Sequence, residues 1–143
     1  MEKIKVGLIG FGKTGKAVAS VILQNTEFSL EWVLRQSKLL HHRSVPEYLG
    51  IDSEEPGLIY SSITISIKEL LDKHPVDIII DFSSTTGIYT YGQIASERKI
   101  KIISAISHYT EKEKELLKVL SLSTTVFWSP NITLGVNYMG GMA

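Results

Sequence analysis

The feature that most constrains this chain is a glycine-rich turn near its N-terminus. The turn reads Gly10-Phe11-Gly12-Lys13-Thr14-Gly15 and follows a short apolar run over residues 4–9. Beyond it the apolar spacing changes to that of a helix. The helix face expected to be buried is Ala17, Val18, Val21 and Ile22. A strand, a G-x-G-x-x-G turn and a helix in this order form the context in which the motif binds a dinucleotide.

Each glycine of the turn has its own mechanical role. Gly10 permits a tight exit from the strand, Gly12 lets a pyrophosphate approach the backbone, and Gly15 lets the helix pack against the strand. The helix N-terminus offers free N–H groups and a partial positive charge to phosphates. We therefore expect Gly10, Phe11, Gly12, Lys13, Thr14 and Gly15 to bind NAD(P)H, with a ligand-free tight turn as the alternative.

Strand and helix patterns alternate along the rest of the chain. Strands are expected at residues 28–34, 58–61, 76–82, 100–104 and 126–128, and helices at 66–73, 86–99 and 110–121. Ser66 with Glu69 and Thr110 with Glu113 have capping-box spacing. Residues 35–57 predict a loop with one short helical turn near residues 46–49. The alternation predicts an α/β fold of the Rossmann type, a doubly wound and mostly parallel sheet in a single domain.

Length and composition agree with a globular domain. At 143 residues, 43% hydrophobic and 21% charged, the chain fits one domain. Fifteen basic and fifteen acidic side chains cancel, which argues against nucleic-acid and membrane partners. The absence of cysteine excludes a thiolate metal site, and no targeting segment or membrane span is recognisable, so a cytoplasmic protein is expected.

The end of the second expected strand bears on cofactor choice. An NAD site places Asp or Glu about 20 residues beyond the glycine turn, to bind the ribose 2′-hydroxyl. This chain has Arg35, Ser37 and Lys38 in that region and no carboxylate. A guanidinium pairs well with phosphate oxygens, so NADP(H) is favoured over NAD(H). The alternative is a solvated basic loop.

Three further segments resemble the 4-hydroxy-tetrahydrodipicolinate reductases (dihydrodipicolinate reductases). Residues 80–83, Ile-Asp-Phe-Ser, are similar to the family's Asp-Phe-Ser/Thr strand end, and residues 104–107 stand where the family has Gly-Thr-Thr-Gly. Residues 129–137, Ser-Pro-Asn-Ile-Thr-Leu-Gly-Val-Asn, are similar to its Ala-Pro-Asn-x-Ser-x-Gly-Val-Asn segment. The resemblance implies that the nicotinamide end of the cofactor lies near Phe82, Ser83, Ser84, Ser104, Ala105, Pro130 and Asn131.

The resemblance also implies an activity and a domain boundary. It implies hydride transfer from NAD(P)H to a cyclic imine or enamine acid in lysine (diaminopimelate) biosynthesis. Residues 1–136 would be the dinucleotide-binding domain and residues 137–143 a hinge or tail. The family's substrate domain, with a His-His stretch, a lysine proton donor and a Ser-Gly-Thr segment, has no counterpart here, so no catalytic residue is assigned. Residues 104–107 also lack both family glycines.

Other functions remain open from the sequence. The chain could be a stand-alone nucleotide-binding or sensing module, or the cofactor domain of another amino-acid dehydrogenase, such as a diaminopentanoate or homoserine type. Because the family's C-terminal segment completes this domain, we expect exposed apolar surface and a homo-oligomer, most simply a dimer.

The four histidines do not form a metal site in the sequence. His41 and His42 are interpreted as exposed loop residues, and His74 as a helix cap. His108 is the one local acid–base candidate.

Overall fold

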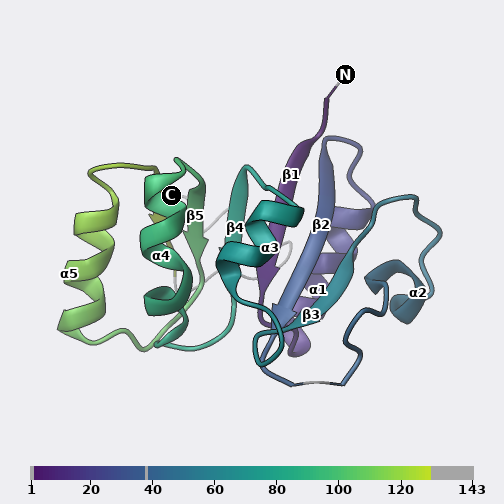
Figure 1. Cartoon of the computed structure of the whole chain (residues 1–143), viewed down its shortest axis with the longest axis horizontal. Coiled ribbons are helices and arrows are strands. Elements are labelled where there is room, and N and C mark those ends of the chain that lie inside the picture. Colours follow the sequence, from purple (N-terminus) through teal and green to yellow (C-terminus); the bar gives the residue numbers. More distant parts are fainter. Residues whose placement is uncertain (1, 38, 130–143) are drawn as a thin grey trace.

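The apolar run before the glycine turn forms the central strand of a parallel sheet. The computed structural model describes residues 2–37 and 39–129. Within them the strands are β1 (Ile4–Ile9), β2 (Phe28–Arg35), β3 (Leu58–Ser61), β4 (Ile78–Asp81), β5 (Lys101–Ser104) and β6 (Val126–Trp128). The strand order is β3-β2-β1-β4-β5-β6, and every neighbouring pair is parallel (Figure 1). The expected Rossmann-type, doubly wound fold is confirmed.

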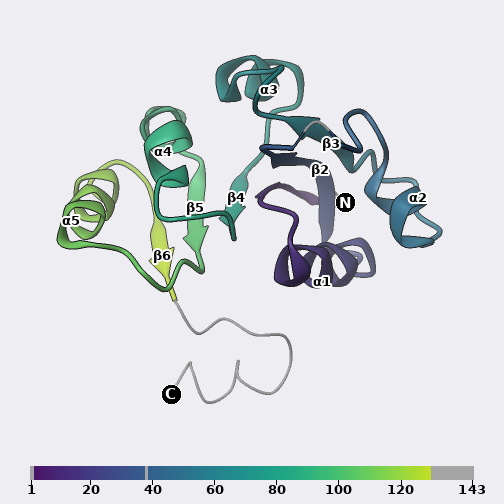
Figure 2. The same cartoon turned by 90° about the horizontal axis from the view of Figure 1, so that it is seen from below.

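Helices pack against both faces of the sheet. They are α1 (Lys13–Leu23), α2 (Val45–Leu49), α3 (Ile67–Lys73), α4 (Gly87–Glu97) and α5 (Glu111–Leu120). Figure 2 shows α1 and α2 on one side and α3, α4 and α5 on the other. Each face has its own apolar cluster, one around Leu8, Leu30 and Val33, the other around Trp32, Ile79 and Ile102. Burial on both faces explains the nearly continuous apolar strands.

The order of the strands creates a crevice beside β1. From β1 the chain winds outward to β2 and β3, then returns to β4 on the opposite side and continues to β5 and β6. Ligands of open α/β sheets bind where the winding direction reverses, at the carboxyl ends of the strands. That point lies between β1 and β4, where the glycine turn and the segment after Asp81 meet.

The buried face of α1 differs from the expected one. Val18 and Ile22 are buried, but Val21 is 49% exposed, and Ala19 and Leu23 are buried instead. Gly15 lies directly against the Gly10 carbonyl and so fixes which face of α1 points toward the sheet. Residues 18, 19 and 22 share that face because they follow Gly15 at helical spacing. The expectation for Val21 was therefore wrong.

The ends of several elements also differ from the sequence prediction, most of all in β4 and α4. β4 covers Ile78–Asp81 rather than residues 76–82, and α4 covers Gly87–Glu97 rather than residues 86–99. The helix ends early because Lys99 is left-handed, with φ 59°, and the Ile100 N–H returns to the Ala95 carbonyl. Both capping boxes and the short helix α2 are confirmed.

Candidate functional site

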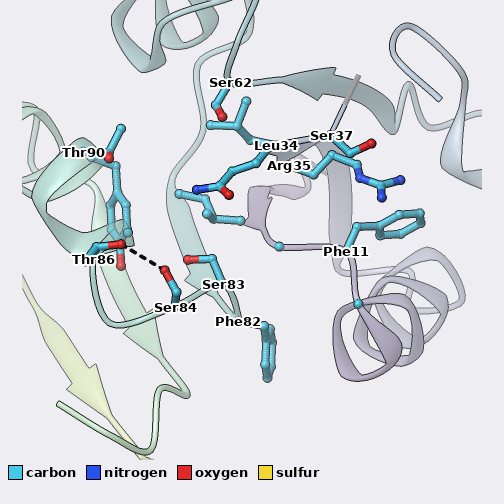
Figure 3. A pocket seen from close by; sticks show the side chains of 16 residues that line it. Phe11, Leu34, Arg35, Ser37, Ser62, Phe82, Ser83, Ser84, Thr86 and Thr90 are labelled. Carbon is cyan, nitrogen blue, oxygen red and sulfur yellow. Dashed lines mark hydrogen bonds between the residues drawn. The ribbon is translucent and has the colours of Figure 1, made fainter. Parts of the chain in front are cut away.

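A cleft of about 390 Å³ lies at the carboxyl ends of β1, β2 and β4. The glycine turn, the end of β2 and the β4–α4 loop contribute most of its walls (Figure 3). Its lining residues are Ile9, Gly10, Phe11, Gly12, Leu34, Arg35, Gln36, Ser37, Ser62, Phe82, Ser83, Ser84, Thr86, Gly87, Thr90 and Tyr91. The cleft therefore occupies the crevice that the strand order creates.

The glycine turn forms one wall of the cleft, and its three glycines meet different surroundings. Gly10 has φ +98°, and a Cβ there would lie 2.9 Å from the Phe82 carbonyl carbon. A Cβ on Gly15 would lie 2.7 Å from the Gly10 oxygen, so Gly15 permits α1 to sit against the turn. A Cβ on Gly12 would meet nothing within 4 Å. Gly10 and Gly15 thus serve packing, whereas the space over Gly12 is available for a ligand.

The end of β2 forms the second wall and carries a positive charge. Gly10 N–H donates to the Leu34 carbonyl at 2.8 Å, which joins this strand to the glycine turn. Arg35 and Ser37 both line the cleft. Within residues 2–37 and 39–129, no carboxylate lies at ion-pair distance from Arg35. The Arg35 guanidinium can therefore pair with an anionic ligand.

The β4–α4 loop forms the third wall and is anchored on a buried carboxylate. Asp81 is fully buried at the end of β4. Its Oδ1 accepts hydrogen bonds from Ser83 N–H at 2.8 Å and from Ser83 Oγ at 2.6 Å, and its Oδ2 accepts one from Tyr91 Oη at 2.7 Å. A Cβ on Gly87 would collide with the Ser83 hydroxyl and would lie 3.3 Å from Asp81 Oδ2. These contacts give the loop one conformation beside the cleft.

Burial shifts the ionisation of the groups beneath this loop. Desolvation raises the pKa of Asp81, while the hydrogen bonds from Ser83 and Tyr91 oppose the rise. Burial, followed by the nearby Asp81 charge, raises the pKa of Tyr91 well above its usual value. Burial also raises the pKa of Tyr109 to about 12. Both tyrosines thus keep their protons near neutral pH, and Tyr91 donates its proton to Asp81 Oδ2.

The structure brings together many of the residues singled out from the sequence. Those lining the cleft are Gly10, Phe11, Gly12, Arg35, Ser37, Phe82, Ser83 and Ser84. Lys13, Thr14 and Gly15 lie in the first turn of α1 and are not among the lining residues. Ser104 is buried with its Oγ 2.6 Å from Tyr109 Oη, and Ala105 is half-buried, so neither lines the cleft. Pro130 and Asn131 lie outside the described residues.

Several lining residues were not identified from the sequence. They are Ile9, Leu34, Gln36, Ser62, Thr86, Gly87, Thr90 and Tyr91. The position of Ser62 was a usable signal, because it directly follows β3 and parallel strands end at one edge of the sheet. Thr90 and Tyr91 lie inside α4. The apolar period of a helix indicates which of its faces is buried, but it does not indicate which strand ends that face lies beside.

Other site types find no support in the described part of the chain. It contains no group of three or more His, Cys, Asp or Glu side chains placed to hold a metal ion. His108 is exposed and does not line the cleft. None of the described helices has the length and apolar character needed to span a membrane.

Comparison with known proteins gives the family. The family model described as dihydrodipicolinate reductase, N-terminus, matches residues 4–132. The chain belongs to the dihydrodipicolinate reductase family. The 4-hydroxy-tetrahydrodipicolinate reductase of Bdellovibrio bacteriovorus is 32% identical over 138 residues, which cover 95% of this chain and 48% of the relative. The chain thus spans about half the length of the curated dihydrodipicolinate reductases that it matches.

Solved structures agree on the fold. The dipicolinate-bound dihydrodipicolinate reductase from Paenisporosarcina sp. TG-14 has a TM-score of 0.66 and 14% identity, covering 91% of this chain and 48% of that one. GenD2 from gentamicin A biosynthesis, in complex with NAD, has a TM-score of 0.68 and 13% identity, covering 98% of this chain and 38% of that one. Together with the match to the N-terminal part of the dihydrodipicolinate reductases, these findings make the chain a Rossmann-type pyridine-nucleotide-binding domain.

Proposed function

We propose that this chain is the NAD(P)H-binding domain of a reductase that transfers hydride to a cyclic imine or enamine acid. The observation that carries the proposal is the cleft in which the open face of Gly12, the Arg35 guanidinium and the loop anchored by Asp81 meet. The relatives are named 4-hydroxy-tetrahydrodipicolinate reductases, which supports a role in lysine (diaminopimelate) biosynthesis. The bound nicotinamide supplies the hydride, and the protein orients it.

The walls of the cleft divide the recognition of the cofactor. We assign the pyrophosphate to residues 10–15, where the open space over Gly12 admits it. The adenosine ribose belongs at Arg35 and Ser37, with a 2′-phosphate against the guanidinium, so NADPH is preferred over NADH. The nicotinamide end belongs on the side of the β4–α4 loop. There we assign Phe82, Ser83 and Ser84, which line the cleft. By the family resemblance we also assign Ala105, Pro130 and Asn131 to the nicotinamide end, whereas Ser104 is buried behind the site.

The chemical step needs residues beyond this domain. We place the end of the nucleotide-binding domain near residue 136, and the matched relatives are about twice as long as this chain. The 143-residue chain should therefore bind NADPH without oxidising it in the presence of 4-hydroxy-tetrahydrodipicolinate. An absorbance assay at 340 nm measures this. Sustained turnover would contradict the assignment and would make His108 the first proton donor to examine.

The binding proposal is tested at Gly12. Replacing it by valine (Gly12→Val) fills the open space with a branched side chain while touching no protein atom within 4 Å of the Cβ position. NADPH affinity should fall at least about a hundredfold, since the pyrophosphate loses its approach to the backbone. Isothermal titration calorimetry measures the affinity, and circular dichroism with thermal unfolding measures the fold.

Ser123→Val is the matched control, because Ser123 is exposed and does not line the cleft. It should bind NADPH as the wild type does. Binding that survives Gly12→Val would place the pyrophosphate elsewhere. Unfolding of Gly12→Val would show that this glycine serves the fold rather than the ligand.

A further inference from the structure

The segment after β2 folds back along the outer edge of β3. His42 N–H donates to the Ile59 carbonyl at 2.6 Å, and Ile59 N–H donates to the Arg43 carbonyl at 2.8 Å. An antiparallel bridge between Ser44 and Leu58 extends the pairing. The backbone of residues 42–44 thus covers the edge of the sheet beside the cleft, and the adjacent His41 side chain lies at the end of β3.

Both ring nitrogens of His41 have partners at that strand end. Ser61 N–H donates to His41 Nδ1 at 2.9 Å, so Nδ1 carries no proton. Thr64 Oγ1 lies 3.2 Å from His41 Nε2 and already donates to the Ser61 carbonyl at 3.1 Å, so Nε2 is the donor to Thr64. The bonds therefore require the neutral ring with its proton on Nε2. A second proton, on Nδ1, would point at the Ser61 N–H, so that two donors would face each other and this hydrogen bond would be lost.

The same strand end holds the Arg35 wall of the cleft. Ser61 is fully buried, and its Oγ donates to the Gln36 carbonyl at 3.2 Å. Ser62 N–H donates to the Arg35 carbonyl at 2.8 Å, and Ser62 lines the cleft together with Arg35 and Ser37. Figure 3 shows Ser62, Arg35 and Ser37 along one side of the cleft. His41 is thus joined to this wall through Ser61 and the residue after it.

The backbone around His41 stores strain. Leu40 and His42 both have φ 68°, a left-handed backbone conformation that residues other than glycine rarely adopt. Such strain persists only where surrounding contacts hold it. The His41 hydrogen bonds and the stacking of the His41 and His42 rings, with centroids 3.8 Å apart, supply contacts of this kind. Loss of the His41 bonds would therefore favour a relaxed loop.

Among the described residues, few other ionisable groups face His41. His42 stacks on it, and Tyr60 contacts both rings edge-on, with centroids 5.8 Å and 5.4 Å away. Tyr60 Oη lies 3.0 Å from His74 Nε2, on the far side of Tyr60, and Arg43 is paired with Glu47 at 3.1 Å. Desolvation, followed by the neighbouring His42, lowers the pKa of His41. The ring is therefore neutral at pH 7 and takes up its proton only in acid.

We propose that neutral His41 positions the Arg35–Ser37 wall for the adenosine end of the cofactor, and that a second proton on its ring releases that wall. This inference rests on the proposed nucleotide-binding function. His41 is a positioning residue, because it acts through Ser61 and does not line the cleft. Acidification should therefore weaken NADPH binding through a group outside the site.

The test compares NADPH affinity at pH 8 and pH 5.5 in the wild type, His41→Asn, His41→Leu and His42→Asn. An asparagine Oδ1 can accept the Ser61 N–H as Nδ1 does, but it does not titrate. His41→Leu has no acceptor and should weaken binding at both pH values, whereas His41→Asn should restore it at pH 8. His42→Asn is the control, because asparagine tolerates the left-handed conformation and leaves His41 able to titrate.

The 2′-phosphate of NADPH itself titrates at about pH 6, so pH also changes the ligand. The readout is therefore the difference in NADPH affinity between the wild type and His41→Asn at the same pH. Between pH 8 and pH 5.5, the wild type should lose up to about tenfold more affinity than His41→Asn. A tenfold loss corresponds to a difference of about one unit between the His41 pKa values of the free and the NADPH-bound protein. His42→Asn should lose at least as much as the wild type, because His42 no longer holds down the pKa of His41. Equal losses in the wild type and His41→Asn would overturn the inference. Wild-type protein that fails to bind NADPH at pH 8 would overturn the proposed function as well.

A second measurement does not depend on how the variants fold. By linkage, NADPH should lower the pKa of His41 in the wild type. Titration of the imidazole signals by nuclear magnetic resonance, with and without saturating NADPH, measures this shift. An unchanged His41 pKa would overturn the inference, and a lowered one would support it.

Discussion

At the scale of single residues, Arg35 is the side chain whose chemistry most directly sets cofactor choice. Replacing it by aspartate (Arg35→Asp) removes a donor that can bind a 2′-phosphate. The new carboxylate is instead an acceptor that can bind a ribose 2′-hydroxyl. NADPH should lose roughly 10- to 100-fold in affinity, the equivalent of roughly 1.5–3 kcal/mol for hydrogen bonds to a charged group, while NADH gains. Titration calorimetry with both cofactors measures the reversal.

Lys101→Asp is the matched control for Arg35→Asp. It makes the same change in net charge at an exposed position at the start of β5, at the opposite end of the strands from the cleft. The preference for NADPH should persist in this variant. Equal affinities for NADPH and NADH in the wild type would contradict the assignment of the 2′-phosphate to Arg35.

At the scale of elements, the β4–α4 loop depends on hydrogen bonds to a buried charge. Tyr91→Phe removes the donor to Asp81 Oδ2 and leaves part of a buried carboxylate without a partner. The free energy of unfolding near pH 7 should fall by about 1–3 kcal/mol. That hydrogen bond holds the pKa of Asp81 down against the rise from burial, so its loss raises the pKa further. In the folded variant, Asp81 therefore becomes protonated at a higher pH than in the wild type.

The sign of the pH dependence follows from that shift. The destabilisation by Tyr91→Phe is fully present where Asp81 is ionised and shrinks as the pH falls through the folded pKa of Asp81. Urea unfolding at pH 7 and at pH 4.5 measures the difference. Tyr109→Phe is the control, because it removes the same atom from a contact with the Ser104 hydroxyl and should give a loss with little pH dependence. A pH-independent loss in Tyr91→Phe would contradict the role given to Asp81.

At the scale of the whole molecule, one face of the sheet is unevenly covered. On the side of α1 and α2, those helices lie over β1, β2 and β3, while in the described part of the chain no helix lies over β5 and β6 (Figure 2). Ile80, Ile103 and Phe127 are register partners across β4, β5 and β6. Phe127 is 44% exposed. An apolar row of this kind favours a contact, and a two-fold symmetric dimer is the simplest one.

Self-association through this row is expected at micromolar concentration, and sedimentation velocity measures it. Phe127→Asp should shift the protein toward monomer. Leu122→Asp, at an 85% exposed position after α5, should leave the association unchanged. A wild-type monomer that does not bind a hydrophobic dye would contradict the expected dimer.

Most of the fold was predictable because its signals are local. Apolar runs of three to seven residues marked the strands, and Ser66 and Thr110 marked two helix starts through bonds within one turn. The glycine turn was recognisable from a short segment, because Gly15 lies against the Gly10 carbonyl, a backbone group of the motif itself. Arg35, Phe82 and Ser83 were predictable as cleft residues because each stands at or just after the end of a parallel strand.

Tertiary structure decided the features that depend on distant partners. Val21 lies in the apolar period of α1, yet the contact between Gly15 and Gly10 turns it toward solvent. His41 reads in the sequence as a solvated loop residue, yet Ser61, 20 positions away, supplies its N–H partner. The sequence by itself determined the Rossmann turn and the alternation of elements, because those rest on bonds between near neighbours. Only the folded chain decided which polar groups share the cleft, because that depends on which strand ends the sheet places side by side.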